Sequence, residues 1–293
     1  MNYLDELDSE LQLAGIPPRR RRRIVAEFSD HLSESPAAEL GVAKDLARQF
    51  ADELGTRLAR AAAFRAFLAL AAAGLATFAM FLAIGRIHGL VLYGGRAHRT
   101  PAWSAPLLLT AALSAQLALA AGGLALLRAW RLRHLPVIGT ADAQILLRRA
   151  WVGVLAGTVT LTALPVIALA YPQVGGSTWR PAAWVVSGLG LLGLIAVVPV
   201  LLSSGRLRPR RSAPSGDLQD DLLALLPWAP APREAALLLA LVIAATLTAA
   251  GLVTNDPYDG ALRGITDALF CLAGYVLFGR YLGLRETGQR TTS

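Results

Sequence analysis

The chain has 293 residues, of which 55% are hydrophobic, and it carries a formal net charge of +8. Charged residues make up only 16% of it, against roughly a quarter in soluble globular domains, and the mean hydropathy is +0.49. This composition excludes an ordinary soluble domain and favours a membrane protein. The basic residues, all arginine except Lys44, lie beside apolar segments, so membrane topology explains them better than direct binding of nucleic acid.

Residues 1–56 predict a small domain of three short helices. Pro18 suits the first turn of the second helix, because its missing N–H would be unpaired there in any case. Gly15 and Gly55 are expected to end the first and third helices. Apolar residues recur at helical spacing and can meet in one core: they are Leu4, Leu7 and Leu11, then Ile24, Phe28 and Leu32, then Leu46, Phe50 and Leu54.

Six apolar segments follow, each with about the 17–25 residues that a helix needs to cross a hydrocarbon core of about 30 Å. They are residues 66–84, 105–127, 150–170, 182–202, 235–253 and 262–282. Helix is expected because lipid cannot satisfy unpaired backbone groups. The predicted fold class is therefore all-α: a six-helix membrane bundle over residues 57–285 behind the N-terminal domain, with a short tail at 286–293.

The arginines that flank the spans predict the orientation. With the N-terminus in the cytoplasm, most of them fall on the cytoplasmic side, whereas few, such as Arg86 and Arg180, fall outside. By the positive-inside rule both termini are expected in the cytoplasm.

The longest predicted cytoplasmic loop covers residues 203–234. Its segment 217–228 has the pattern of a short amphipathic helix that lies on the inner leaflet. A solvated loop is the alternative.

No catalytic, cofactor or metal-binding motif is recognisable. The four histidines, His31, His88, His98 and His134, are not spaced as helical pairs, and the single cysteine, Cys271, adds no ligand cluster. A glycine-rich phosphate loop with its lysine and a Gly-x-Ser-x-Gly elbow are absent. We therefore expect no enzyme and no cofactor; an unrecognised intramembrane enzyme is the least favoured alternative.

Asp267 lies inside the last predicted span, where a carboxylate is costly and marks a candidate functional position. Arg263 lies one turn earlier and can pair with it. Because both residues fall near the expected outer end of the span, a structural ion pair is favoured over an ion or proton pathway.

Glycine and proline residues mark the third and fourth spans. Gly153 and Gly157 form a Gly-x-x-x-Gly pair, which lets helices approach closely. Packing within one bundle is the favoured interpretation, with a dimer face or a substrate path as alternatives. Pro165 and Pro199 each remove a helix hydrogen bond and are expected to kink their helices.

The most concentrated charge is the run Arg19, Arg20, Arg21, Arg22 and Arg23. Five consecutive residues point all round a helix, so they cannot all face one partner. The run can start a solvated helix, bind anionic lipid headgroups or dock an acidic protein surface.

The N-terminal segment resembles a known family. Residues 3–7, then the second helix with Glu27, His31 and Leu32 in a Glu-x-x-x-His-Leu pattern, then 45–55 ending in Leu54-Gly55 are similar to the HAAS-type, or permease-prefix, domain. The resemblance covers about residues 1–60. It implies a signalling or docking module on the cytoplasmic membrane of a bacterium, associated with PadR-like repressors and, in some proteins, with ABC-type permease segments.

Two functions follow as expectations. The first is a non-enzymatic regulatory membrane protein whose cytoplasmic domain docks a soluble partner, such as a PadR-like transcription repressor. The docking candidates are Arg19–Arg23, Glu27 and His31. The alternative is a transporter, or the membrane subunit of an ABC-type export system with a partner ATPase.

Overall fold

The computed structural model describes residues 2–34, 41–88, 104–170, 176–207, 209, 218–223, 228, 231–253, 257–279 and 281–284. The predicted tail at 286–293 lies outside them. The described residues form helices joined by turns and contain no strand. The helices are α1 (Tyr3–Leu13), α2 (Pro18–Glu34), α3 (Ala43–His88), α4 (Ser104–Arg131), the 3-10 turn η2 (Leu132–His134), α5 (Thr140–Ala170), α6 (Gly176–Arg206), α7 (Leu218–Leu223), α8 (Pro232–Val253) and α9 (Pro257–Phe278).

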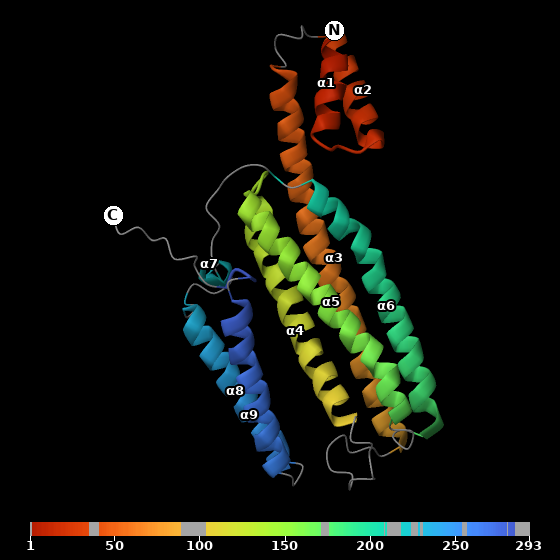
Figure 1. Ribbon diagram of the computed structural model, residues 1–293, viewed down its shortest axis with the longest axis vertical. Coiled ribbons are helices and arrows are strands. Elements are labelled where there is room, and N and C mark those ends of the chain that lie inside the picture. The colour runs from red at the N-terminus through yellow and green to blue at the C-terminus, as the bar shows by residue number, and fades with distance from the viewer. Residues whose placement is uncertain are drawn as a thin grey trace, which may run out of the picture.

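Six of these helices, α3, α4, α5, α6, α8 and α9, are long and apolar enough to cross a membrane. The prediction of an all-α bundle with six spans is therefore confirmed, and the chain is a multi-pass membrane protein. Helices α3 to α6 lie side by side, α8 and α9 form a hairpin next to α4, and α1 and α2 lie at one end against α3 (Figure 1). We call this end of the bundle the domain end.

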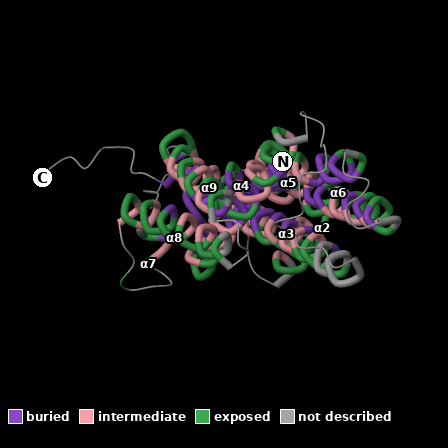
Figure 2. The backbone as a smooth tube through the Cα atoms, turned by 90° about the horizontal axis from the view of Figure 1, so that it is seen from below, coloured by how far each residue is buried: buried purple, intermediate pink, exposed green. Residues whose placement is uncertain are grey.

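Burial follows the pattern of a protein surrounded by lipid. The buried stretches gather where α3, α4, α5 and α6 meet, and exposed stretches line the outside (Figure 2). Large apolar side chains such as Leu189, Leu192 and Ile195 are exposed on α6. In water so much exposed apolar surface would be unfavourable, whereas hydrocarbon accepts it.

The apolar stripes of the N-terminal segment meet in one core. Leu7 and Leu11 of α1 are fully buried there, and Phe28 of α2 meets Phe50 of α3 edge to face, with ring centroids 5.9 Å apart. Gly15 turns the chain from α1 to α2 with a φ of 81°, a left-handed conformation that glycine adopts without strain. The third wall of this core is the first part of α3.

Helix α3 runs without a break from the domain through the bundle, so the predicted helix end at Gly55 is wrong. Residues 56–65 are mostly alanine, leucine and arginine, which favour helix. A Cβ atom on Gly55 would lie 2.2 Å from the carbonyl oxygen of Leu207 and 3.1 Å from Pro209. The glycine therefore serves the close approach of the chain after α6.

The loop between α4 and α5 is tied to α3 just beyond that contact. The backbone N–H of Ile138 donates a 3.1 Å hydrogen bond to the Thr56 hydroxyl, and the Arg60 guanidinium donates to the carbonyls of Leu132 and Leu135. These bonds fix the junction between the domain and the bundle.

Two predicted boundaries need correction. Helix α5 begins at Thr140 rather than at residue 150, because a helix can extend beyond the apolar segment and carry charges there. Helix α9 ends at Phe278 rather than at residue 282, and Gly283, with a φ of 64°, lies in the turn that follows. Within segment 217–228 the described helix is Leu218–Leu223, and its Leu218 and Asp221 are buried in the protein.

Replacing Gly55 with alanine should destabilise the protein by about 1–3 kcal/mol, because the new methyl group must displace a backbone carbonyl. The control is Gly205→Ala, since a Cβ atom on Gly205 meets nothing within 4 Å. Thermal unfolding of the purified protein in detergent measures both variants. Equal melting temperatures for the two would contradict the assigned role of Gly55.

Candidate functional site

The five arginines at the start of α2 have different surroundings. Arg21 donates a 2.6 Å hydrogen bond to the side chain of Gln12 and lies 3.6 Å from a carboxylate oxygen of Asp8, so it joins α2 to α1. Arg19 and Arg22 are exposed. Being three residues apart, these two share one face of α2. The arginine run therefore contains an internal contact as well as exposed side chains.

Glu27 and His31, two residues on which the HAAS-type resemblance is based, are also exposed on α2. Arg23 donates a 2.8 Å hydrogen bond to Glu27. The His31 ring contacts Phe28 of the domain core edge to face, with centroids 6.3 Å apart. Together these groups give α2 a surface of mixed charge.

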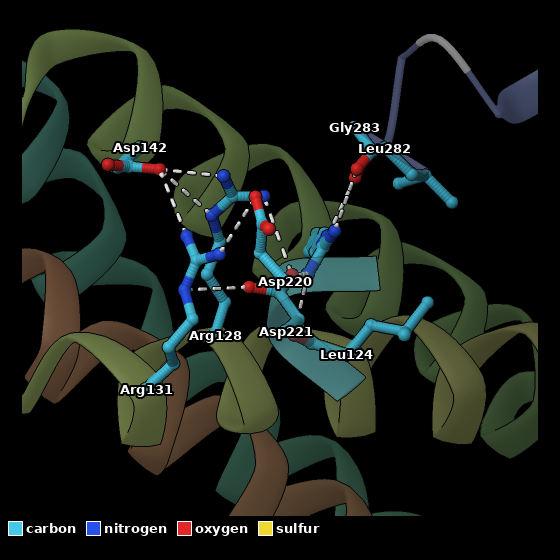
Figure 3. Close-up of polar contacts among 9 residues, drawn as sticks. Leu124, Arg128, Arg131, Asp142, Asp220, Asp221, Leu282 and Gly283 are labelled. Atoms are coloured by element: carbon cyan, nitrogen blue, oxygen red, sulfur yellow. Dashed lines mark hydrogen bonds and ion pairs between the residues drawn. The ribbon is translucent and has the colours of Figure 1, made fainter. Parts of the chain in front are cut away.

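A buried ion cluster, which the sequence did not predict, lies around α7 at the domain end of the bundle (Figure 1), and Figure 3 shows its contacts. It combines side chains of three helices: Arg128 and Arg131 of α4, Asp142 and Arg149 of α5, and Asp220 and Asp221 of α7. Their formal charges cancel, which limits the penalty of removing them from water.

Arg149 makes the widest set of contacts in this cluster. Its guanidinium donates hydrogen bonds to Asp221 at 3.0 Å and to the backbone carbonyls of Leu124, Leu282 and Gly283 at 2.8, 2.7 and 3.2 Å. One fully buried side chain thus joins α4, α5, α7 and the segment after α9.

Asp221 and Asp142 complete the cluster. Asp221 lies 3.0 Å from Arg149, 3.2 Å from Arg131 and 3.5 Å from Arg128. Burial raises the pKa of the Asp221 carboxyl above its usual value, and the three arginines offset part of that effect. Asp142 accepts two hydrogen bonds from Arg128, at 2.6 and 3.1 Å.

Asp267 lies further from the end of its helix than predicted, and its carboxylate contacts another helix. It lies near the middle of α9, about 15 Å along the axis from either end, because the helix begins at Pro257. Its carboxylate accepts a 2.9 Å hydrogen bond from the amide of Gln116, in the middle of α4. Arg263 is exposed on α9.

Gln116 and Asp267 line a cavity of about 710 Å³ between α4 and the α8–α9 hairpin. Its other walls are largely apolar and include Leu124, Leu239 and Phe270. Leu218 of α7 and Leu282 lie at its domain end, next to the ion cluster. The cavity could hold an apolar chain with one polar group at the amide and the carboxylate.

The predicted glycine pair lies inside the bundle. A Cβ atom on Gly153 would meet Leu70 of α3 at 3.0 Å, and one on Gly157 would meet Leu70 at 2.5 Å and Leu194 of α6 at 3.3 Å. These contacts correspond to packing within one chain rather than to a dimer face. Pro165 is buried in α5 and Pro199 is exposed on α6, and both helices continue past their proline.

Comparison with known proteins gives no relative: no family model, no curated protein and no solved structure matches the chain. The HAAS-type resemblance therefore depends on the motif residues of the first 60 positions alone. The described residues also contain no group of histidine, cysteine and acidic side chains that could hold a metal ion.

Breaking the ion cluster should be costly. Asp221→Asn leaves an uncompensated positive charge among buried arginines and should lower the free energy of unfolding by roughly 3–5 kcal/mol. Asp220→Asn, on the same helix but with a side chain that is 55% exposed, should cost much less. Thermal unfolding in detergent compares them, and equal losses would show that burial of Asp221 does not matter.

The contact between Gln116 and Asp267 should contribute about 1 kcal/mol, the size measured for hydrogen bonds between membrane helices. Asp267→Leu removes the acceptor and should lower the melting temperature, whereas Asp267→Asn keeps an acceptor oxygen and should stay close to wild type. If both variants are equally destabilised, the negative charge and not the hydrogen bond is what α9 requires.

Proposed function

We propose that the protein is a non-enzymatic regulatory protein of the bacterial cytoplasmic membrane, with both termini in the cytoplasm. Its N-terminal domain docks a soluble protein, for which the HAAS-type resemblance favours a PadR-like transcription repressor. Most arginines that flank the spans are expected on the same side of the membrane as the N-terminus, which supports this orientation.

The observation that carries the proposal is the continuity of α3. One helix supplies Ala43 and Ala47 to the core of the domain and Ala66 and Leu70 to the core of the bundle. A rearrangement of the bundle that shifts α3 must therefore shift the domain core with it. A rigid helix is one of the elements able to carry coupling between two sites, provided that it has two arrangements.

The exposed face of α2 is the proposed docking surface. Arg19 and Arg22 project from it, whereas Glu27 and His31 are exposed on other sides of the helix. Arg21 is excluded because it is engaged with α1. An acidic patch on the partner would complement the two arginines.

Crosslinking and co-purification from native membranes test this proposal. The full chain should recover a soluble partner, and the double variant Arg19→Ser/Arg22→Ser should recover at least tenfold less of it. The matched control is Arg133→Ser/Arg233→Ser, which removes two exposed arginines elsewhere. Recovery of no soluble partner, or equal recovery with both variants, would overturn the proposal.

The cavity at Gln116 and Asp267 supports a second candidate function, that of a transporter or the membrane subunit of an export system. An acid in the middle of a span beside an apolar cavity is a site at which a substrate can bind. If this second function is correct, an ATPase should co-purify with the chain whether or not Arg19 and Arg22 are replaced. In addition, Asp267→Asn should fail to restore export in a deletion strain.

A further inference from the structure

A second cavity, of about 630 Å³, lies where the N-terminal domain meets the bundle. One wall is α2, with Arg20 and Arg23, and the other is α3, with Arg57 and Arg65. Glu27 and Glu53 also line it, so the arginines outnumber the acids. The cavity therefore presents a net positive charge to any molecule that enters it.

The α3 wall is a single face of the helix. Its residues recur three to four positions apart, which is the spacing of one helical face: they are Phe50, Glu53, Leu54, Arg57, Leu58, Ala61 and Arg65. From the first to the last this face extends about 22 Å along the axis. It leads from the domain core to the edge of the apolar span that begins at about residue 66.

Apolar side chains lie beside the cavity's arginines. Leu58 and Ala61 lie between Arg57 and Arg65 on α3, and Val200 of α6, within the span that ends at Arg206, faces the same cavity. The cavity thus offers guanidinium groups and apolar contacts together at the membrane edge. An anionic phospholipid presents both a phosphate and acyl chains at this level.

The arginines differ in how far they are already neutralised. Arg23 pairs with Glu27 at 2.8 Å and Arg57 lies 4.0 Å from Glu53. Arg20 and Arg65 are exposed and form no ion pair within the described part of the chain. They come from the two opposite walls, so one anionic group between them would be held by both helices.

We propose that this cavity binds the headgroup of an anionic phospholipid of the inner leaflet, with the phosphate between Arg20 and Arg65 and the start of an acyl chain against Leu58, Ala61 and Val200. The inner leaflet supplies such lipids, and basic side chains near its surface are attracted to them. A lipid held there bridges α2 and α3 and fixes the domain on its helix.

Native mass spectrometry of the purified full chain in detergent tests the proposal, with added phosphatidylglycerol or phosphatidylcholine as the probe. Phosphatidylglycerol should be retained and phosphatidylcholine should not. Arg20→Gln/Arg65→Gln should weaken retention about 30-fold, because each arginine near an anionic surface contributes about fivefold to the affinity. The matched control, Arg19→Gln/Arg22→Gln, removes two charges from outside the cavity and should bind as wild type.

A further variant tests the cavity without altering its charge. Ala61→Trp fills the cavity between Arg57 and Arg65 and should also reduce retention of phosphatidylglycerol, with the melting temperature confirming that the variant is folded. The proposal is overturned if Arg19→Gln/Arg22→Gln weakens binding as much as Arg20→Gln/Arg65→Gln, because a general positive field would then suffice. It is also overturned if glycerol phosphate competes as well as the lipid, which indicates a soluble ligand, or if an acidic peptide displaces the lipid from a tighter site.

No docked protein is needed for this experiment. Loss of lipid binding and failure to recover a soluble partner are therefore separate outcomes, and the lipid site stands or falls independently of the docking surface at Arg19 and Arg22.

Discussion

The buried guanidinium of Arg149 is the interaction on which the arrangement of the bundle depends. It is surrounded by Asp221 and three backbone carbonyls contributed by α4 and by the turn after α9. A buried guanidinium without such acceptors would be prohibitively costly, so the segments that supply them are held in place together. Because α8 and α9 pack mainly on each other, a few contacts attach the hairpin to α4. They are this cluster, the hydrogen bond between Gln116 and Asp267, and the buried leucines Leu218, Leu282 and Leu284, against which Leu124 and Tyr275 pack.

Each of the two cavities lies where two parts of the protein pack over a small area, whereas α3, α4, α5 and α6 pack closely. Small residues let α3, α4, α5 and α6 approach closely. For example, Leu70 of α3 packs directly against Gly153 and Gly157 of α5. The α8–α9 hairpin has no comparable interface with α4, which leaves the apolar cavity around Asp267. The N-terminal domain contacts the bundle mainly through α3, which leaves the basic cavity between α2 and α3. Loose junctions of this kind are the places where ligands bind and where elements move.

The continuity of α3 connects these features physically. The first part of the helix packs in the domain core, and Leu70 packs in the bundle core. Between them, Thr56 and Arg60 form hydrogen bonds with the loop between α4 and α5. At Gly55 it also receives the chain that leaves α6. A rearrangement of the bundle and a change at the membrane edge would therefore both act on α3.

The sequence by itself determined the class of the protein. Apolar segments of membrane-spanning length predict helices because hydrocarbon leaves the backbone no alternative, and stripes such as Leu7 and Leu11 or Phe28 and Phe50 predict which faces meet. Arg128, Arg131 and Arg149 flank predicted spans, and the sequence explains such arginines as topology signals without any partner. Asp221 is 72 residues from Arg149 in sequence, and it lies on the short described helix Leu218–Leu223. No periodicity links such a pair, so only the tertiary structure could show that these charges meet. The structure likewise decided that Gly55 lies inside a helix and that Asp267 bonds with Gln116, since close approach and partner choice depend on which segments lie side by side.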